Sequence, residues 1–168
     1  ASESSELIEI IGNNSNNNIT ANSENNVIYG HGGSNKLYGL GGDDTYYVNS
    51  SPTIIYEDLD AGTDTVYVGA DFTDNRYFLS DNVEILWVVD NESLLTIFGN
   101  GVDNVIHGNG LNNTIDGGNG NDIAHGGAGD DIYKLDSLSD RAIEQVDQGN
   151  DSVFITNSSI TINDVIEN

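Results

Sequence analysis

The sequence predicts an all-β fold: a right-handed parallel β-roll, or β-helix, built from nonapeptide repeats. Three observations predict it. Nine-residue blocks recur without gaps in two arrays, and each block has Asn or Asp at its sixth position. The second array follows the first at an offset of 87 residues, so that Asp131 corresponds to Asp44. Each block divides into a six-residue turn and a three-residue strand, whose middle residue points inward while its neighbours point outward.

The first array follows a lead-in strand that we expect over residues 1–11. Its four blocks are GNNSNNNIT (12–20), ANSENNVIY (21–29), GHGGSNKLY (30–38) and GLGGDDTYY (39–47). Their sixth residues are Asn17, Asn26, Asn35 and Asp44, and their eighth residues are Ile19, Ile28, Leu37 and Tyr46. Two blocks complete one coil, so each block is expected to stack on the block two places later.

The second array repeats this pattern with more glycine. Its blocks are GNGVDNVIH (99–107), GNGLNNTID (108–116), GGNGNDIAH (117–125) and GGAGDDIYK (126–134). Their sixth residues are Asn104, Asn113, Asp122 and Asp131. The offset holds beyond the arrays, where Glu57 corresponds to Glu144 and Asp64 to Asp151. We therefore expect one module over residues 12–98, whose least repetitive part (69–98) still adds strands, and a shortened second module over residues 99–168 that continues the first.

Composition limits the partners of this chain. It carries 28 acidic and 4 basic side chains, for a formal net charge of -24. Such a charge disfavours nucleic acid and anionic membranes, since both require Lys and Arg to neutralise phosphate. The chain has no cysteine, which excludes disulfides and thiolate zinc sites. A disordered Gly/Asn-rich linker is the alternative, but an apolar eighth residue in block after block argues against it when cations are present.

The acidic turns point to a hard cation. Ca²⁺ prefers six to eight oxygen ligands, and stacked glycine-rich turns supply carboxylates together with backbone carbonyls that no Cβ obstructs. The pattern G-G-x-G-x-D-x-U-x, with U an apolar residue, is the calcium-binding nonapeptide of parallel β-helices. GGNGND and GGAGDD match its turn fully. The sequence therefore predicts several calcium ions as cofactors.

These motifs resemble the repeats-in-toxin (RTX, hemolysin-type) calcium-binding family, and the resemblance extends over nearly the whole chain from residue 12. It implies ligation by Asp44, Asp122 and Asp131. It also implies carbonyl ligands from turn glycines, namely Gly39, Gly42, Gly117, Gly118, Gly120, Gly126, Gly127 and Gly129. Further ligands expected from the flanking segments are Glu57 and Asp64 with the Asp44 turn, Glu144 and Asp151 with the Asp131 turn, and secondarily Asp60 and Asp147.

The departures from the family pattern also carry expectations. Asn occupies the sixth position in five of the eight blocks, and an amide supplies an oxygen without a charge. Sites at Asn17 and Asn26 should be weak or replaced by ladders of stacked Asn side chains. Asn104 and Asn113 should pair with Asp122 and Asp131 on the next coil, so sites there retain one carboxylate.

Outward positions carry aromatic and histidine residues. Tyr29 should stack on Tyr47, and Tyr38 on Tyr56, either as a glycan-binding platform or as pairs that stiffen the sheet. His107 and His125 should stack likewise, either as a transition-metal site or as two exposed imidazoles. Trp87, within the apolar run VEILWVV, is expected in the core or in a cap.

No catalytic constellation emerges, so we expect a non-enzymatic protein. The family resemblance implies a calcium-binding module of a secreted or cell-surface bacterial protein of the adhesin, toxin or surface-layer type. It implies folding on Ca²⁺ after type I secretion. The alternative is a carbohydrate-binding accessory module of a secreted polysaccharide-modifying enzyme, similar to the repeat modules of alginate epimerases. The expected partners are calcium ions and, for the alternative, extracellular polysaccharide, without nucleic acid and without membrane insertion.

Overall fold

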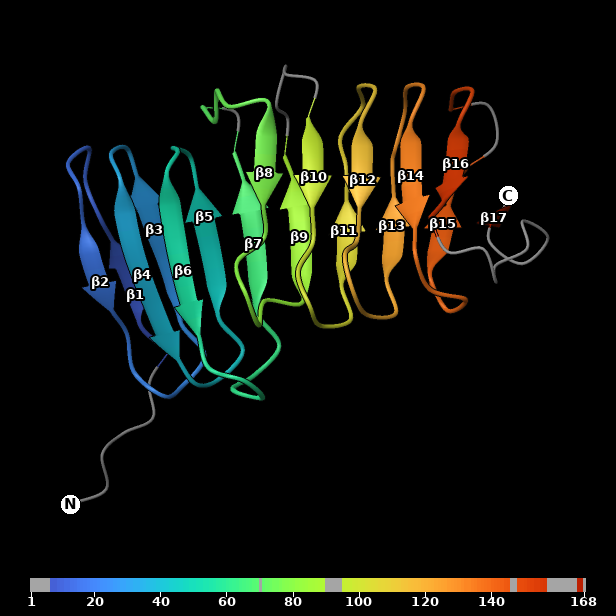
Figure 1. The fold of residues 1–168 in the computed structure, drawn as a ribbon. Coiled ribbons are helices and arrows are strands. Elements are labelled where there is room, and N and C mark those ends of the chain that lie inside the picture. Colours follow the sequence, from blue (N-terminus) through green and yellow to red (C-terminus); the bar gives the residue numbers. More distant parts are fainter. Residues whose placement is uncertain (1–6, 70, 90–94, 146–147, 157–165, 168) are drawn as a thin grey trace.

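A computed structural model describes residues 7–69, 71–89, 95–145, 148–156 and 166–167. Within these residues the chain forms strands and turns and no helix, and hence no helix of the length and hydropathy that a bilayer crossing needs. The strands pair in parallel and stack as about eight coils, which confirms the predicted parallel β-roll (Figure 1).

One face of the roll is a continuous sheet of nine strands, sheet A. Its strands are β1 (Glu9–Ile11), β3 (Val27–His31), β5 (Thr45–Val48), β7 (Thr65–Val68), β9 (Ile85–Val88), β11 (Val105–His107), β13 (Ile123–His125), β15 (Arg141–Ile143) and β17 (Ile166–Glu167).

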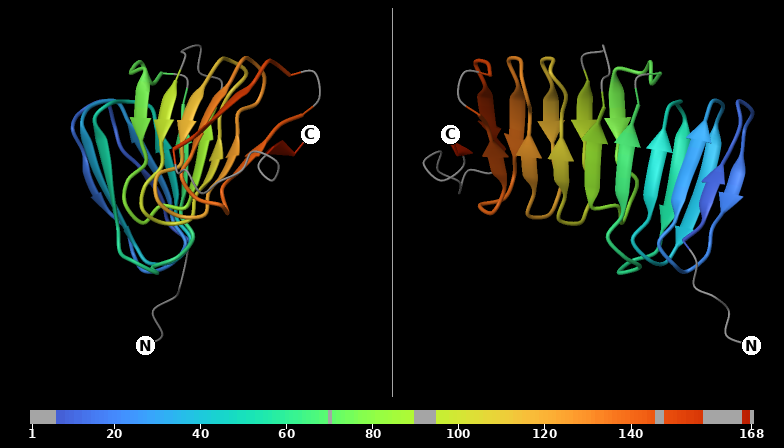
Figure 2. Two further views of the ribbon diagram at one scale, coloured as in Figure 1. Left: turned by 45° about the vertical axis from the view of Figure 1, so that its right-hand side comes forward. Right: turned by 180° about the vertical axis from the view of Figure 1, so that it is seen from behind.

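The opposite face is divided into two sheets. Sheet B contains β2 (Asn18–Thr20), β4 (Asn35–Leu40) and β6 (Thr53–Glu57). Sheet C contains β8 (Arg76–Phe78), β10 (Thr96–Phe98), β12 (Thr114–Asp116), β14 (Ile132–Leu135) and β16 (Ser152–Ile155). β6 and β8 do not pair, and the coils before this break sit offset from those after it (Figures 1 and 2).

The strand register follows from the nonapeptide frame. Val27 pairs with Thr45, and Thr114 with Ile132, so each block lies on the block two places later as predicted. Outside the arrays several coils lengthen, as where Thr45 pairs with Thr65, whereas Ile123 pairs with Arg141 at the regular offset. The segment over residues 69–98 adds β8, β9 and β10, as expected.

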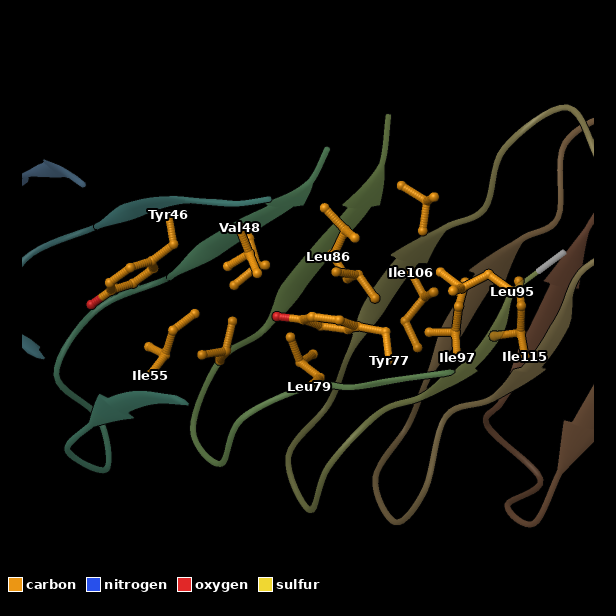
Figure 3. Close-up of a cluster of buried hydrophobic side chains, with 14 of the residues drawn as sticks. Tyr46, Val48, Ile55, Tyr77, Leu79, Leu86, Leu95, Ile97, Ile106 and Ile115 are labelled. Atoms are coloured by element: carbon orange, nitrogen blue, oxygen red, sulfur yellow. The ribbon is translucent and has the colours of Figure 1, made fainter. Parts of the chain in front are cut away.

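The core is a single column of apolar side chains between the two faces. The eighth residue of the blocks points into it, as Ile28, Leu37 and Ile106 illustrate with 0% exposure. Leu86 and Ile97 continue the column through the least repetitive part of the sequence (Figure 3). The column is shared by neighbouring coils, so burial between the sheets stabilises each coil against the next but gives no coil a core of its own.

The outer face of sheet A carries a ladder of stacked rings. The predicted pair Tyr29–Tyr47 is confirmed, with ring centroids 4.4 Å apart. The predicted pair His107–His125 is confirmed as well, at 4.6 Å. Tyr67 and Trp87 link the two pairs into one row.

The expectation that Trp87 lies in the core or in a cap is wrong. Trp87 is 39% exposed and stacks on His107 with 3.5 Å between ring centroids. The reason is register, because Trp87 aligns with the outward residues Tyr67 and His107. Its neighbours Leu86 and Val88 take the inward positions.

A core substitution tests the burial pattern. Ile106→Ala removes a fully buried side chain from β11 and should lower the free energy of unfolding by about 2–5 kcal/mol. Ile11→Ala is the matched control, because Ile11 lies on β1 and is 62% exposed. Urea unfolding of both variants in the presence of Ca²⁺ measures the difference. Equal losses of stability would contradict the assignment of inward and outward positions.

Candidate metal sites

The turns of the roll form two edges. Edge A consists of the turns that lead into the strands of sheet A, and edge C consists of those that lead into sheets B and C. At both edges, the side chain of the last residue of a turn accepts a hydrogen bond from a backbone N–H one coil earlier. The donor is the last residue of the turn at the same edge. Asp44 accepts from Asn26 on edge A at 2.6 Å, and Asp131 accepts from Asn113 on edge C at 2.6 Å.

The first acidic cluster lies on edge A. It brings together Asp44, Glu57 and Asp64, with one carboxylate oxygen of each within 4.8 Å of the others. Asp44 and Asp64 are each 1% exposed. The buried Tyr46 hydroxyl donates a hydrogen bond to one oxygen of Glu57. The other Glu57 oxygen and Asp44 Oδ2 are buried without a hydrogen-bond partner.

The second cluster repeats the first on edge C. Asp131, Glu144 and Asp151 also lie with their oxygens within 4.8 Å of one another. The Tyr133 hydroxyl donates to Glu144, and Asp131 Oδ2 and Glu144 Oε2 are buried without a partner. In the described part of the chain, these two clusters are the places where three or more potential metal ligands come together.

The electrostatics of both clusters favour a bound cation. Burial raises the pKa of Glu57 and Asp64 to about 7 each, and neighbouring carboxylates add to the effect. Burial likewise raises the pKa of Asp131 to about 7. Within the described residues the salt bridge is Lys134–Asp116, on the outer face, so no basic side chain pairs with either cluster. Buried, unpartnered carboxylate oxygens from several turns are a donor set that suits Ca²⁺.

Asp122 marks a further, smaller position on edge A. It accepts the backbone N–H of Asn104 at 2.8 Å, as the predicted pairing requires, and its Oδ2 is buried without a partner. Burial raises its pKa to about 7, with Asp140 and Asp136 as the nearest acidic contributors. Asp122 therefore resembles the cluster carboxylates in its surroundings, but it belongs to neither group of three ligands whose oxygens lie within 4.8 Å of one another.

Glycine at the first turn position makes room for these carboxylates. A Cβ on Gly39, Gly117 or Gly126 would overlap the Oδ2 atom of the aspartate that ends the same turn. Glycines later in the turns have left-handed backbone conformations, with φ of 94° at Gly42 and 103° at Gly127. The same holds for Gly118, Gly120 and Gly129. Seven of the eight predicted glycines thus lie in the turns beside the acidic residues, and Gly39 lies near the end of β4. Ligation by their carbonyls remains a prediction.

Other predicted residues lie elsewhere. Asp60 is exposed, with φ of 58°, and belongs to neither cluster. Asp147 lies outside the described residues. Asn17 donates both its backbone and its side-chain N–H to Asn35 Oδ1, each at 3.0 Å. An Asn ladder therefore stands at this turn pair, as expected.

The sequence pattern did not predict the roles of four residues at the edges. Glu84 accepts the backbone N–H of Asp64 at 2.8 Å, and Asp140 accepts that of Asp122 at 3.0 Å. Both precede a strand of sheet A one coil after a predicted acid, so extending the coil period past the arrays would have found them. The pattern predicts that Tyr46 and Tyr133 point inward, but it does not predict that their hydroxyl groups contact Glu57 and Glu144. The only sequence sign of these contacts is that both pairs recur in the duplication.

A matched pair of glycine substitutions tests the close approach. Gly126→Ala should destabilise the roll by about 1–3 kcal/mol or more, because the added methyl group overlaps Asp131 and the Tyr133 hydroxyl. Gly110→Ala places its methyl group in open space and should change stability by about 0.5 kcal/mol or less. Thermal unfolding of both variants in Ca²⁺ compares them. Equal effects would show that the Asp131 carboxylate does not lie close to Gly126 in the folded protein.

The raised carboxylate pKa values predict how pH affects the metal-free roll. The folded state holds protons on Glu57, Asp64, Asp122 and Asp131 up to about pH 7, whereas the unfolded state releases them near the ordinary values of 3.8 and 4.5. Stability is therefore greatest at low pH and falls as pH rises through about 7. His107 opposes this below pH 6.5, since burial lowers its pKa to about 4, but it is outnumbered by the four acids.

Circular dichroism in a calcium chelator checks this dependence. We expect more β-structure at pH 5 than at pH 8, and less difference between the two when Ca²⁺ is in excess. A metal-free spectrum that gains β-structure as pH rises would contradict the burial of these carboxylates.

Comparison with known proteins agrees with this geometry. The family model of the RTX calcium-binding nonapeptide repeat, which spans four copies, matches residues 11–46 and again residues 98–133. No curated protein and no solved structure is significantly similar to the chain. The matched segments hold the turns of Asp44, Asp122 and Asp131, each with a buried, unpartnered oxygen. The chain therefore contains two arrays of RTX calcium-binding nonapeptide repeats.

Proposed function

We propose that this chain is a non-catalytic calcium-binding module whose folding is driven by Ca²⁺. The observation that carries the proposal is the pair of buried acidic triads. Asp44, Glu57 and Asp64 form the first, and their counterparts at residues 131, 144 and 151 form the second. In each triad two buried carboxylate oxygens have no hydrogen-bond partner. A divalent cation at each triad supplies the partner that the chain itself lacks.

The coupling between metal and folding follows from the cost of burial. Without a cation, stacking the coils brings carboxylates together in a poorly solvated place, and both desolvation and repulsion oppose it. Ca²⁺ binds the stacked turns and not the unfolded chain, so its binding free energy adds to the stability of the fold. The remaining charge of the chain, formally -24, strengthens the dependence on cations.

The setting in which such folding is useful is outside the cell. RTX repeat proteins are in general secreted, and we propose the same for this chain, as part of a bacterial adhesin, toxin or surface-layer protein. Low calcium in the cytosol keeps the acidic turns apart during type I secretion, and higher calcium outside lets them stack. This proposal is supported by the repeat family and by the buried, unpartnered carboxylates of the triads.

A role as a carbohydrate-binding accessory module is the second candidate. The tyrosine pairs by themselves do not favour it, because the rings of Tyr29 and Tyr47 lie 4.4 Å apart and cover each other's faces. The same holds for the facing sides of Tyr38 and Tyr56, at 4.5 Å. Sheet stiffening accounts for these contacts. The break between β6 and β8 also holds a groove, lined by residues from 51–57 and from 72–82, and this groove is the feature that favours carbohydrate.

A calcium titration followed by far-UV circular dichroism tests the main proposal, with Mg²⁺ as the control ion. Glu144→Gln removes a triad charge at nearly constant shape and should raise the calcium midpoint by about tenfold, as loss of metal-site partners commonly does. Glu24→Gln is the control, because Glu24 is exposed and belongs to no triad. A full β-spectrum in excess chelator at pH 8, or equal midpoints for both variants, would exclude calcium-driven folding through the triads.

A further inference from the structure

The break between sheets B and C opens a groove in the side of the roll. Its volume is about 550 Å³, a size that suits a small organic ligand. Strand β6 with the residues before it forms one wall, and β8 with its flanking residues forms the other. Most of the second wall comes from residues 72–82, which follow no nonapeptide frame and have no part in the metal clusters.

The groove is fixed by side chains that take the place of strand pairing. The backbone N–H of Ile55 donates to Ser80 Oγ at 3.2 Å, and Asn82 Nδ2 donates to the backbone carbonyl of Glu57 at 2.9 Å. A paired β8 would have satisfied these groups of β6. These two hydrogen bonds therefore occupy part of the edge that β6 would otherwise offer to an added strand.

The break also interrupts a row of stacked rings. Tyr38 stacks on Tyr56 before the break, and Phe78 stacks on Phe98 after it, with centroids 4.5 and 4.6 Å apart. Among the ring pairs of the described chain, Tyr56 and Phe78 do not stack on each other, although both line the groove. They are 40% and 63% exposed. Each therefore has one face covered by its partner ring and the other turned toward open space.

Polar side chains line the groove together with these two rings. Asp74, Arg76, Asp81 and Asn82 line the same groove, and the first three are exposed. Ser51 Oγ donates to Asp74 Oδ2 at 3.4 Å and connects the two walls. A pair of aromatic faces among carboxylate, guanidinium and amide groups matches a pyranose sugar. The C–H groups of such a sugar pack on ring faces, and its hydroxyls exchange hydrogen bonds with polar side chains.

The charge of the chain selects among sugars. Three acidic residues, Glu57, Asp74 and Asp81, line the groove against the single base Arg76. With a formal net charge of -24 on the chain, a polyanionic glycan would be repelled. A neutral saccharide has no such penalty.

We propose that this groove is a binding site for a neutral pyranose sugar, packed against Tyr56 and Phe78 and hydrogen-bonded by Asp74, Arg76 and Asp81. Apart from Glu57, which also belongs to the first acidic cluster, the lining residues have no part in the metal clusters, and the site requires that the roll is folded. It lies at the break in the coil stack and uses residues outside the repeat.

Isothermal titration calorimetry of the calcium-loaded chain tests the site. The probes are glucose, galactose, mannose and N-acetylglucosamine, each as a monosaccharide and as its β- or α-linked oligomers. The variants are Tyr56→Ala and Phe78→Ala, and the control is Phe154→Ala. Phe154 is an outward residue of sheet C, 57% exposed, and does not line the groove. Circular dichroism of every variant in Ca²⁺ establishes beforehand that the roll is folded.

We expect at least one probe to bind, and each groove variant to raise its Kd by about tenfold, the effect of losing one aromatic contact. Phe154→Ala should leave the Kd unchanged. Absence of binding by folded protein to the whole panel would overturn the proposal, as would binding that both groove variants retain. A peptide or a sulfated glycan that binds the groove in place of neutral sugars would overturn it too. Failure to fold in Ca²⁺ would instead refute calcium-driven folding, so the two proposals fail by different readouts.

Discussion

The architecture depends on one arrangement, a carboxylate whose two oxygens have different tasks. In Asp44 and Asp131 one oxygen accepts a backbone N–H from the adjacent coil and so joins two turns, while the other is buried without a partner. Stacking the coils therefore cannot be separated from bringing unpartnered negative charge together. With four basic residues against 28 acidic ones, the chain cannot neutralise these oxygens itself. The proposed cation between turns would satisfy the buried oxygens and hold the coils in register at the same time.

Much of this could be predicted from sequence, because the relevant period is local. A nine-residue frame determines which side chain of each block points inward and which block lies above which, and the registers of β3 to β5 and β12 to β14 follow it. The grouping of Glu57 and Asp64 with Asp44 also follows, since the turn motif returns with altered spacing after the array. Where the coil lengthens, the frame no longer applies. Glu84 was missed for that reason, since it follows Asp64 by 20 residues. Asp140 follows Asp122 by the regular 18 residues, and it was missed because the frame was not extended beyond residue 134. The outward direction of Trp87 was missed because an apolar run such as VEILWVV does not reveal which of its alternate residues face the core.

The duplication has a geometric consequence that the offset alone does not reveal. Corresponding strands β5 and β14 belong to opposite faces of the roll, sheet A and sheet C. The second repeat array is therefore turned by half a coil relative to the first. As a result the two acidic triads lie on opposite edges, and cations bound at both would fasten the stack from both sides. Two sites on opposite edges resist separation of the coils better than two sites on one edge would. If only one edge were fastened, the coils could open at the other edge.

The duplication also distinguishes side chains that recur in both modules from side chains that occur in only one. The triad and its tyrosine recur in full, as Tyr46 and Glu57 correspond to Tyr133 and Glu144. The outward tyrosines do not recur, since Tyr38 corresponds to His125 and Tyr56 to Ile143. A side chain needed for coil stacking must be present wherever coils stack, whereas one that contacts a ligand at a single break in the sheet has no such requirement. The aromatic wall of the groove belongs to the second kind. Its presence in one copy alone agrees with the proposed local binding site. It does not separate the wall from the tyrosine pair of sheet A, because Tyr29 and Tyr47 correspond to Asp116 and Lys134 and are likewise found in one copy.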